Sequence, residues 1–266
     1  MDNRDYCEAN RAAWNAAMPY HQKAKSRAWD QAFSDPDFIC QQEPELSLLQ
    51  EQGIASRDIV HLCCNNGIEL MSLCRLGAGR CVGFDISDNA ILDAKSRSAR
   101  FGISCEFYQS NVYDVPHEFH ACFDLVYFTI GALCWLPDLV GLFKVASMLL
   151  RPGGKIFIYD QHPFTTVLPW DVSDASHKPV LEHSYFVDEC CVSDEGLDYY
   201  GNVPYHGPTT YEFTHKLSDI MGALLENQFR ITLFREYDHD ISCGLAWVRE
   251  TGLKLPLSYI LCAEKG

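Results

Sequence analysis

Residues 59–85 read IVHLCCNNGIELMSLCRLGAGRCVGFD, and this stretch decides the fold. Residues 59–64 form a short, mostly apolar run that is long enough for a buried strand. Residues 65–67, Asn-Asn-Gly, predict a turn because these residue types tolerate positive φ. Residues 68–76 show the apolar spacing of a helix, and a second apolar run then closes on Asp85. The stretch therefore predicts a β-α-β unit with a ligand-binding turn after its first strand.

The spacing of this unit indicates a ligand with a ribose and an anionic group. The turn exposes backbone N–H groups at a helix N-terminus, where negative charge is favoured. Asp85 lies 18 residues after Gly67, close to the ~20 of nucleoside binders, whose acid accepts from the ribose hydroxyls. A dinucleotide requires G-x-G-x-x-G, but Cys63 and Asn65 stand at the glycine positions. S-adenosylmethionine has a carboxylate and no phosphate, so it needs fewer glycines. An ordinary βα turn without a ligand is the alternative.

The remaining chain continues the alternation of helices and strands. Residues 2–17 predict a helix that Pro19 breaks. Residues 160–210 have no helical period and are rich in aromatic residues, so we expect an insertion of one or two β-hairpins. Further helices are predicted over 44–52, 88–100, 138–150 and 217–228, and further strands over 104–108, 123–130, 155–159, 230–237 and 256–263.

The composition limits the class of function. The 266 residues are 47% hydrophobic, and 21 Lys+Arg oppose 36 Asp+Glu for a formal charge of −15. This charge disfavours nucleic acid and anionic membranes as partners. The 13 cysteines include no C-x-x-C pair, and His162, His183 and Asp160 lack the tight spacing of metal ligands, so no metal site is expected. The N-terminus lacks the apolar core of a secretion signal, and no apolar run approaches ~18 residues, so we expect a soluble cytoplasmic protein.

The order of these motifs resembles class I S-adenosylmethionine-dependent methyltransferases of the small-molecule type. The resemblance spans residues 45–266 and is carried by residues 59–67, Asp85, Asn111, FDLVYFTI at 123–130, LLRPGGKIFIYD at 149–160 and a closing strand pair. It implies an α/β fold with a Rossmann-like seven-stranded sheet in the order 3-2-1-4-5-7-6, one strand antiparallel and helices on both faces. It also implies an N-terminal helical lid segment at 1–44 and an inserted lid at about 161–210, after strand 5, that covers the acceptor site.

The resemblance also assigns roles within the expected cofactor site. The first-strand turn, residues 63–67, should face the methionine end and the ribose. Asp85 should bind the ribose hydroxyls, and Ile86 should pack on the adenine. Asn111 falls where the family often has an Asp bonded to the adenine amino group, and Val112 should donate its backbone N–H to the ring.

Further positions complete the expected site. Thr129 and Ile130 match residues at the methionine end, and His61 replaces the usual acid of the first strand. Trp14 and Tyr20 belong to an N-terminal aromatic region expected to roof the site. The predicted cofactor-binding residues are Tyr20, His61, Cys63, Asn65, Asn66, Gly67, Asp85, Ile86, Asn111, Val112, Thr129 and Ile130.

These assignments imply an enzyme that transfers a methyl group from S-adenosylmethionine to a small organic acceptor and releases S-adenosyl-L-homocysteine. Alignment of the reactants supplies most of the catalysis, so a base is optional. His162, just after the fifth strand, is the candidate base. The expected protein is a monomer or homodimer. Two alternatives remain: a non-enzymatic cofactor-binding or interaction protein on the same fold, suggested by the missing glycines, and a protein or RNA methyltransferase or another nucleoside-using enzyme.

Overall fold

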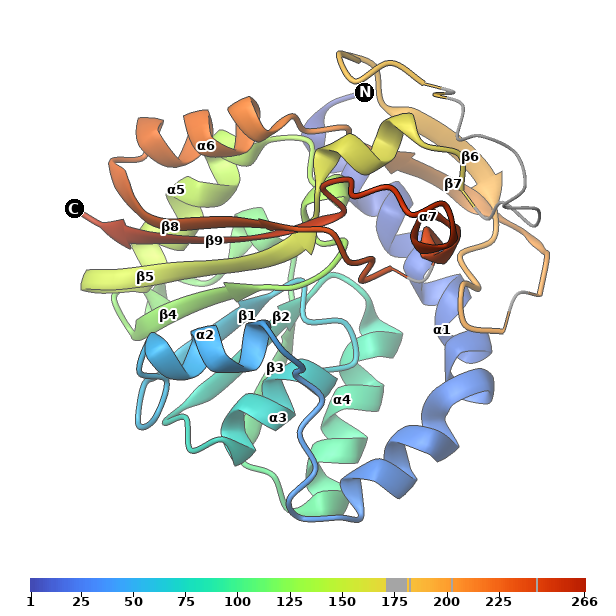
Figure 1. The fold of residues 1–266 in the computed structure, drawn as a ribbon. Coiled ribbons are helices and arrows are strands. Elements are labelled where there is room, and N and C mark those ends of the chain that lie inside the picture. The colour runs from blue at the N-terminus through green and yellow to red at the C-terminus, as the bar shows by residue number, and fades with distance from the viewer. Residues whose placement is uncertain (171–180, 182, 202, 243) are drawn as a thin grey trace.

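A computed structural model describes residues 1–170, 181, 183–201, 203–242 and 244–266. The described chain is an α/β sandwich with one large sheet and one small hairpin (Figure 1). The helices are α1 Asn3–Phe33, α2 Glu45–Glu51, α3 Ile68–Arg75, α4 Asp88–Phe101, α5 Leu139–Leu149, α6 Leu217–Glu226 and α7 Ala246–Glu250. The strands are β1 Ile59–Leu62, β2 Cys81–Asp85, β3 Cys105–Gln109, β4 Phe123–Phe128, β5 Leu150–Gln161, β6 Cys191–Glu195, β7 His206–Glu212, β8 Phe229–Tyr237 and β9 Ser258–Lys265. Short 3₁₀ turns are η1 Val112–Asp114, η2 His117–Phe119, η3 Leu133–Trp135 and η4 Pro163–Val167.

The large sheet has seven strands in the order β3-β2-β1-β4-β5-β9-β8. The first five strands are parallel, and β9 is antiparallel to both of its neighbours, β5 and β8. Since β8 and β9 are the sixth and seventh strands of this sheet along the chain, the predicted order 3-2-1-4-5-7-6 with one antiparallel strand is confirmed. The carboxyl ends of β1 to β5 therefore meet along one edge, which we call the carboxyl edge.

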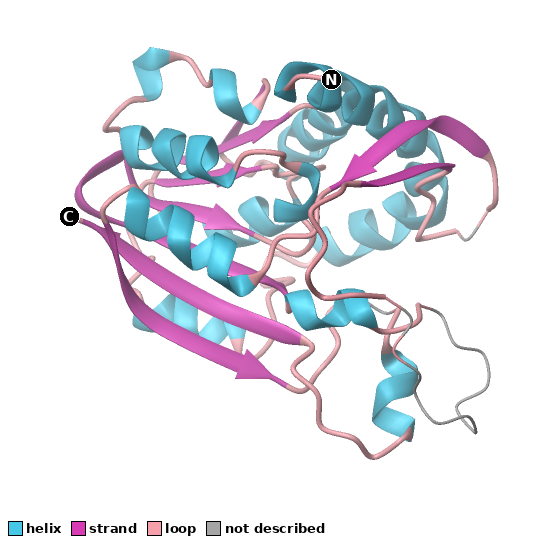
Figure 2. Cartoon of the chain, turned by 90° about the horizontal axis from the view of Figure 1, so that it is seen from above, coloured by secondary structure: helices cyan, strands magenta, loops and turns pink. Residues whose placement is uncertain are grey.

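Helices cover both faces of this sheet because alternate strand residues point to opposite sides (Figure 2). On one face, Val60 and Leu62 of β1 pack into a core with α5 and α6. On the other face, Ile59 packs with residues of α2, α3 and α4. The central strands are buried on both faces, which explains their nearly continuous apolar sequence. In the described part of the chain, none of the helices has the length and apolar character needed to cross a bilayer.

The first helix differs from its prediction. We expected it to end near Ala17, before Pro19, but α1 continues through Pro19 to Phe33. A proline removes one backbone hydrogen bond and crowds the preceding turn. Buried side chains on both sides of it, including Met18 and His21, hold the helix by tertiary contacts that local preference does not report.

Polar side chains in the first half of α1 hold this helix to two other elements. The Arg11 guanidinium donates to both carboxylate oxygens of Asp88, at the start of α4. The side chain of Asn10 accepts from Tyr211 N and donates to Tyr211 O, both at 2.8 Å, so it extends the edge of β7. Helix α1 thus connects the beginning of α4 to the hairpin.

The predicted insertion contains a hairpin in which β6 and β7 pair antiparallel. Its second strand extends to Glu212, just beyond the predicted limit at 210. Phe213 N then donates to Cys134 O at 2.7 Å and joins the hairpin to the loop after β4. Figure 1 shows the hairpin and α1 on the side toward which β5 points, so both lie at the carboxyl edge. Part of the predicted insertion, residues 171–180, lies outside the described residues.

The turn between β1 and α3 requires a glycine for two separate reasons. Gly67 has φ of 73°, in the left-handed region. Its Cα also lies against the ring of Phe107 in β3, so that an added Cβ would overlap the ring and would lie 3.2 Å from Ala94 Cβ of α4. This close approach packs the turn before α3 against β3 and α4.

We predict that Gly67→Ala lowers the free energy of unfolding by about 2–4 kcal/mol, the sum of left-handed strain and overpacking. Gly102→Ala is the matched control, because Gly102 also has positive φ but its added Cβ meets nothing within 4 Å. The control should lose only about 1–2 kcal/mol. Urea denaturation of both variants measures the difference, and equal losses would contradict the close packing against Phe107.

A buried acid lies beneath the central strands. Glu45 of α2 is buried and accepts a hydrogen bond from the hydroxyl of Tyr127 in β4. Burial raises the pKa of Glu45 to about 8, although the bond from Tyr127 lowers it in part. The carboxyl is therefore largely protonated at neutral pH, since its charged form would be buried without a cationic partner.

This pKa predicts a loss of stability as the pH rises. Below about pH 4.5 Glu45 is protonated in both states, whereas between about pH 4.5 and pH 8 only the folded state keeps the proton. The free energy of unfolding should then fall by up to about 1.4 kcal/mol per pH unit. Glu45→Gln should remove this part of the slope, and Glu51→Gln, exposed on the same helix, should not. Denaturation at several pH values tests this, and equal slopes in the two variants would refute it.

Candidate functional site

The loops after β1, β2, β3 and β4 bring most of the predicted site residues together at the carboxyl edge. Cys63 to Gly67 follow β1, Asp85 and Ile86 end β2, Asn111 and Val112 follow β3, and Thr129 and Ile130 follow β4. Ligands of open α/β sheets bind at this edge. The topology therefore gathers ten of the twelve predicted cofactor-binding residues from separate parts of the chain, with His61 below them in β1.

The turn after β1 keeps a left-handed backbone at the positions where glycines were expected. Cys63 has φ of 58°, Asn65 of 48° and Gly67 of 73°. Asn tolerates this region, whereas Cys is strained there by about 1–2 kcal/mol. The turn thus has the left-handed conformation that glycines favour, but it carries the side chains of Cys63 and Asn65.

Asp85 is bonded to this turn. Its Oδ2 accepts from Asn65 N at 2.7 Å, and its Oδ1 accepts from Ser87 N at 2.8 Å. Burial raises the pKa of Asp85 to about 6, although these hydrogen bonds lower it in part. Each carboxylate oxygen has a second lone pair, so the side chain can still accept from a diol.

His61 is completely buried, and its Nε2 lies 3.1 Å from Thr129 Oγ1. Its ring contacts that of Tyr127, with centroids 4.8 Å apart. Burial lowers the pKa of His61 to about 3, so the imidazole is neutral. Neutral His61 thus supports the loop after β4 from below. It does not bring the negative charge that the usual acid of the first strand would bring to this position.

The loops after β2, β3 and β4 present mixed surfaces. Ile86 is half-buried and Ile130 is exposed. Asn111 is the N-cap of η1, since its Oδ1 accepts from Tyr113 N at 3.1 Å. Its side chain also bonds to the Cys7 thiol, which lowers the pKa of that thiol against the larger effect of burial. The Val112 side chain is buried.

Residues that the sequence did not single out gather beside the turn. Burial raises the pKa of the Cys134 thiol, and the nearby Glu212, Asp160 and Cys63 raise it further. Asp160 Oδ1, at the end of β5, accepts from Gly131 N at 2.6 Å, and burial raises the pKa of Asp160 to about 6. Burial also raises the pKa of Glu212. In the described part of the chain, no donor bonds to the Glu212 carboxylate.

A further acid lies in the first turn of α3. Burial raises the pKa of Glu69, and its side chain accepts no bond from any other residue that the structure describes. Raised carboxyl pKa values that gather in one place are typical of functional sites. Glu69 lies within the sequence of the first β-α-β unit, two residues after Gly67, whereas Asp160 and Glu212 come from strands far apart in the chain.

His162 stands apart from this group. Its Nδ1 accepts from Phe164 N at 3.0 Å as the N-cap of η4. Its Nε2 lies 3.0 Å from Glu236 Oε1 of β8, in a geometry that falls short of a hydrogen bond. Burial lowers the pKa of His162, although Glu236 raises it in part. Its described contacts are therefore with η4, β8 and β9, where its ring faces Tyr259.

Aromatic side chains of α1 and the predicted insertion meet above the turn. The ring of Tyr20 stacks on that of Tyr205 at 4.3 Å. Trp14 contacts Trp135 after β4 edge to face at 5.2 Å, and His21 contacts Tyr199 at 4.5 Å. His21 Nε2 also lies 2.7 Å from Leu197 O. These contacts join α1 to the segment before β7.

A separate small hollow lies at the opposite edge of the sheet. It has a volume of about 80 Å³ and is lined by Asp124, Lys155 and neighbouring loop residues. Small-molecule sites usually enclose about 300–1,000 Å³, so this hollow is too small for a nucleoside. The candidate site is accordingly the carboxyl edge.

Comparison with known proteins identifies the domain at this edge. The family described as "Methyltransferase domain" matches residues 59–154. The ubiquinone biosynthesis O-methyltransferase of Xanthomonas euvesicatoria is 27% identical over 105 residues, 40% of this chain and 43% of that protein. The ribosomal protein L11 methyltransferase of Photobacterium profundum is 30% identical over 113 residues, 42% of this chain and 36% of that protein. The chain thus spans less than half the length of these curated relatives.

Solved structures extend the likeness to most of the chain. An S-adenosylmethionine-dependent methyltransferase from Mesorhizobium loti has a TM-score of 0.60 at 20% identity, covering 83% of this chain and 97% of its own. Geranyl diphosphate C-methyltransferase from Streptomyces coelicolor, solved with S-adenosyl-L-homocysteine, has a TM-score of 0.57 at 13% identity, covering 83% of this chain and 77% of its own. Residues 59–154 therefore match a methyltransferase domain, and the chain has the fold of the class I S-adenosylmethionine-dependent methyltransferases.

Proposed function

We propose that this protein transfers a methyl group from S-adenosylmethionine to a small organic acceptor. The observation that carries the proposal is the turn after β1, which keeps a left-handed backbone at Cys63, Asn65 and Gly67 and is bonded to Asp85. An altered turn that had lost its ligand would have no need to keep the strained backbone of Cys63. Persistent strain at a ligand edge is typical of a functional site.

The residues present fit this cofactor. The Asp85 carboxylate keeps free lone pairs for ribose hydroxyls, and the half-buried Ile86 offers an apolar surface to the adenine. The Asn111 amide and the Val112 N–H can bond to the base. The turn of residues 63–67, with Thr129 and Ile130, would hold the methionine end, and Tyr20 would help to enclose the site from α1.

The cofactor supplies an activated methyl group, and the protein must align the acceptor with it and exclude water. Alignment alone can lower the barrier by about 7–11 kcal/mol. Trp14 and Trp135, together with the Tyr20–Tyr205 stack, form an apolar cover suited to both tasks. The Glu212 carboxylate, to which no donor among the described residues bonds, lies near Cys134.

An aromatic and acidic enclosure favours a neutral or cationic acceptor. The relatives include methyltransferases that act on ubiquinone precursors, geranyl diphosphate and a ribosomal protein, by their names, so they leave the acceptor atom open. The net charge of −15 supports a small molecule over RNA. A non-enzymatic cofactor-binding protein is the second candidate, because two glycines of the turn are replaced.

Binding of the cofactor tests the assignment of the site. Calorimetry with S-adenosylmethionine and S-adenosyl-L-homocysteine should give affinity for the wild type and a loss of about tenfold to a hundredfold in Asp85→Ala, which removes hydrogen bonds to a charged group. Asp93→Ala on α4 is the control and should bind normally, because Asp93 pairs with Arg97 away from the edge. Absence of binding to the wild type would refute the proposal, whereas binding without product from any acceptor tried would favour the non-enzymatic candidate.

The same assignment predicts a pH dependence of affinity. The pKa of Asp85 is about 6, and only the ionised carboxylate accepts from both ribose hydroxyls. The dissociation constant should therefore rise about tenfold between pH 7 and pH 5 if Asp85 alone titrates. Asp85→Asn should bind more weakly with a flatter profile. An unchanged slope in this variant would assign the titration to another group, such as Asp160.

The base, where one is used, is tested by a pair of variants. We propose Glu212, because its carboxylate has no donor among the described residues and lies near Cys134, in the loop after β4. His162 remains the hypothesis from the sequence. Glu212→Gln should lower kcat by about 10²–10⁴ while His162→Ala lowers it by less than about tenfold. The reverse result would assign the base to His162, and small effects of both would indicate catalysis by alignment alone.

A further inference from the structure

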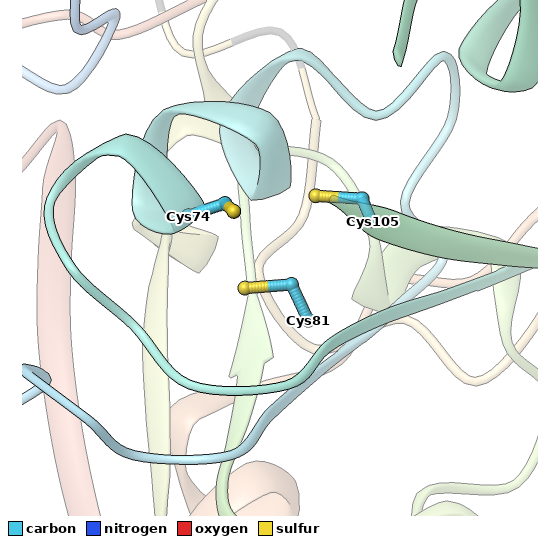
Figure 3. Close-up of side chains that lie close together, drawn as sticks. All are labelled: Cys74, Cys81 and Cys105. Carbon is cyan, nitrogen blue, oxygen red and sulfur yellow. The ribbon is translucent and has the colours of Figure 1, made fainter. Parts of the chain in front are cut away.

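Three cysteines from separate elements converge on one point. Cys74 lies in the last turn of α3, Cys81 is the first residue of β2, and Cys105 is the first residue of β3. Their Sγ atoms all lie within 4.8 Å of one another. Figure 3 shows the three sulfur atoms turned toward a common space. No disulfide joins them.

This cluster is separate from the methyltransferase site. Cys81 and Cys105 are direct partners at the beginning of the β2–β3 pairing, so they lie at the end of the strands opposite to Asp85. Cys74 is likewise at the far end of α3 from the turn at Gly67. The proposed methyl transfer uses none of these three thiols.

The geometry is close to that of a metal site. Zn–S bonds of about 2.3 Å in a tetrahedron place the sulfur atoms about 3.8 Å apart. The three Sγ atoms would therefore need to move by less than about 1 Å to bind the ion. Cys81 is buried, whereas Cys74 and Cys105 are half-buried, which leaves a side open to solvent. Among the described residues, the group contains no fourth His, Cys, Asp or Glu.

The electrostatics favour a divalent over a monovalent ion. Three thiolates with a divalent cation leave a net charge of −1, whereas a monovalent ion leaves −2 in a partly buried place, which costs more free energy.

We propose that Cys74, Cys81 and Cys105 form a three-sulfur site for Zn²⁺, with water as the fourth ligand. On binding, three S–H bonds break and three Zn–S bonds form, so three protons pass to solvent and no electron is transferred. The ion would tie the end of α3 to the beginnings of β2 and β3. This proposal does not depend on the methyltransferase activity.

The test titrates Zn²⁺ alone into the reduced, chelator-treated full chain in competition with a chromophoric chelator. We expect one Zn²⁺ per chain, release of about three protons, and a rise in the thermal midpoint of roughly 5–10 °C at a hundredfold excess over the dissociation constant. Co²⁺ should give thiolate charge-transfer absorption, which a purely structural role of the cysteines would not produce.

Cys74→Ser and Cys105→Ser should each weaken Zn²⁺ binding on the order of a hundredfold, and both replace half-buried groups that folding should tolerate. Cys40→Ser and Cys122→Ser are the matched controls, since these cysteines are also half-buried but lie outside the cluster. Each of four results would overturn the proposal. These are Zn²⁺ binding that the first pair of variants does not weaken, a lack of stoichiometric binding, binding of Cu⁺ but not Zn²⁺, and a disulfide within the cluster in the purified protein.

Discussion

The hydrogen bond from Asn65 N to Asp85 Oδ2 fixes the geometry on which the candidate site depends. It joins the turn after β1 to the acid that ends β2, and these are the two parts that would hold the methionine end and the ribose. The bond requires the backbone of the turn to bend back toward β2. Left-handed conformations at Cys63, Asn65 and Gly67 provide that bend, and the contact of Gly67 with Phe107 holds it against β3.

The turn after β1 adopts left-handed backbone at Cys63 and Asn65, where the sequence has no glycine. Asn replaces glycine at small energetic cost in the left-handed region, whereas Cys adds strain. Burial around the turn then has electrostatic consequences. It keeps His61 neutral and raises the pKa values of Asp85 and Asp160 toward neutrality, so the site is sensitive to mildly acidic pH.

The cover over the site depends on contacts between distant segments. Helix α1 is bonded to α4 through Arg11 and Asp88 and to β7 through Asn10. The chain after β7 is bonded to the loop after β4 through Phe213 N. These bonds place Glu212 beside Cys134, although the two residues lie far apart in the sequence. The proposed acceptor side of the site is therefore assembled by tertiary contacts, while the proposed cofactor side is built largely within residues 59–130.

The sequence by itself determined the order of strands and helices and the position of the cofactor loops. Apolar runs, Gly67 and Asp85 are local signals, and the parallel topology carries the loops that follow β1 to β4 to one edge whatever their exact composition. Most helix and strand boundaries were accordingly predicted closely. The extension of α1 through Pro19 was not, because burial of Met18 and His21 outweighs the local effect of a proline. Only the tertiary structure decided that Glu212 and Asp160 meet near Cys134, that His162 lies beside Glu236, and that Cys74, Cys81 and Cys105 form one cluster. Spacing along the chain contains no information on such contacts, since they arise from the pairing of strands and the packing of helices between distant segments.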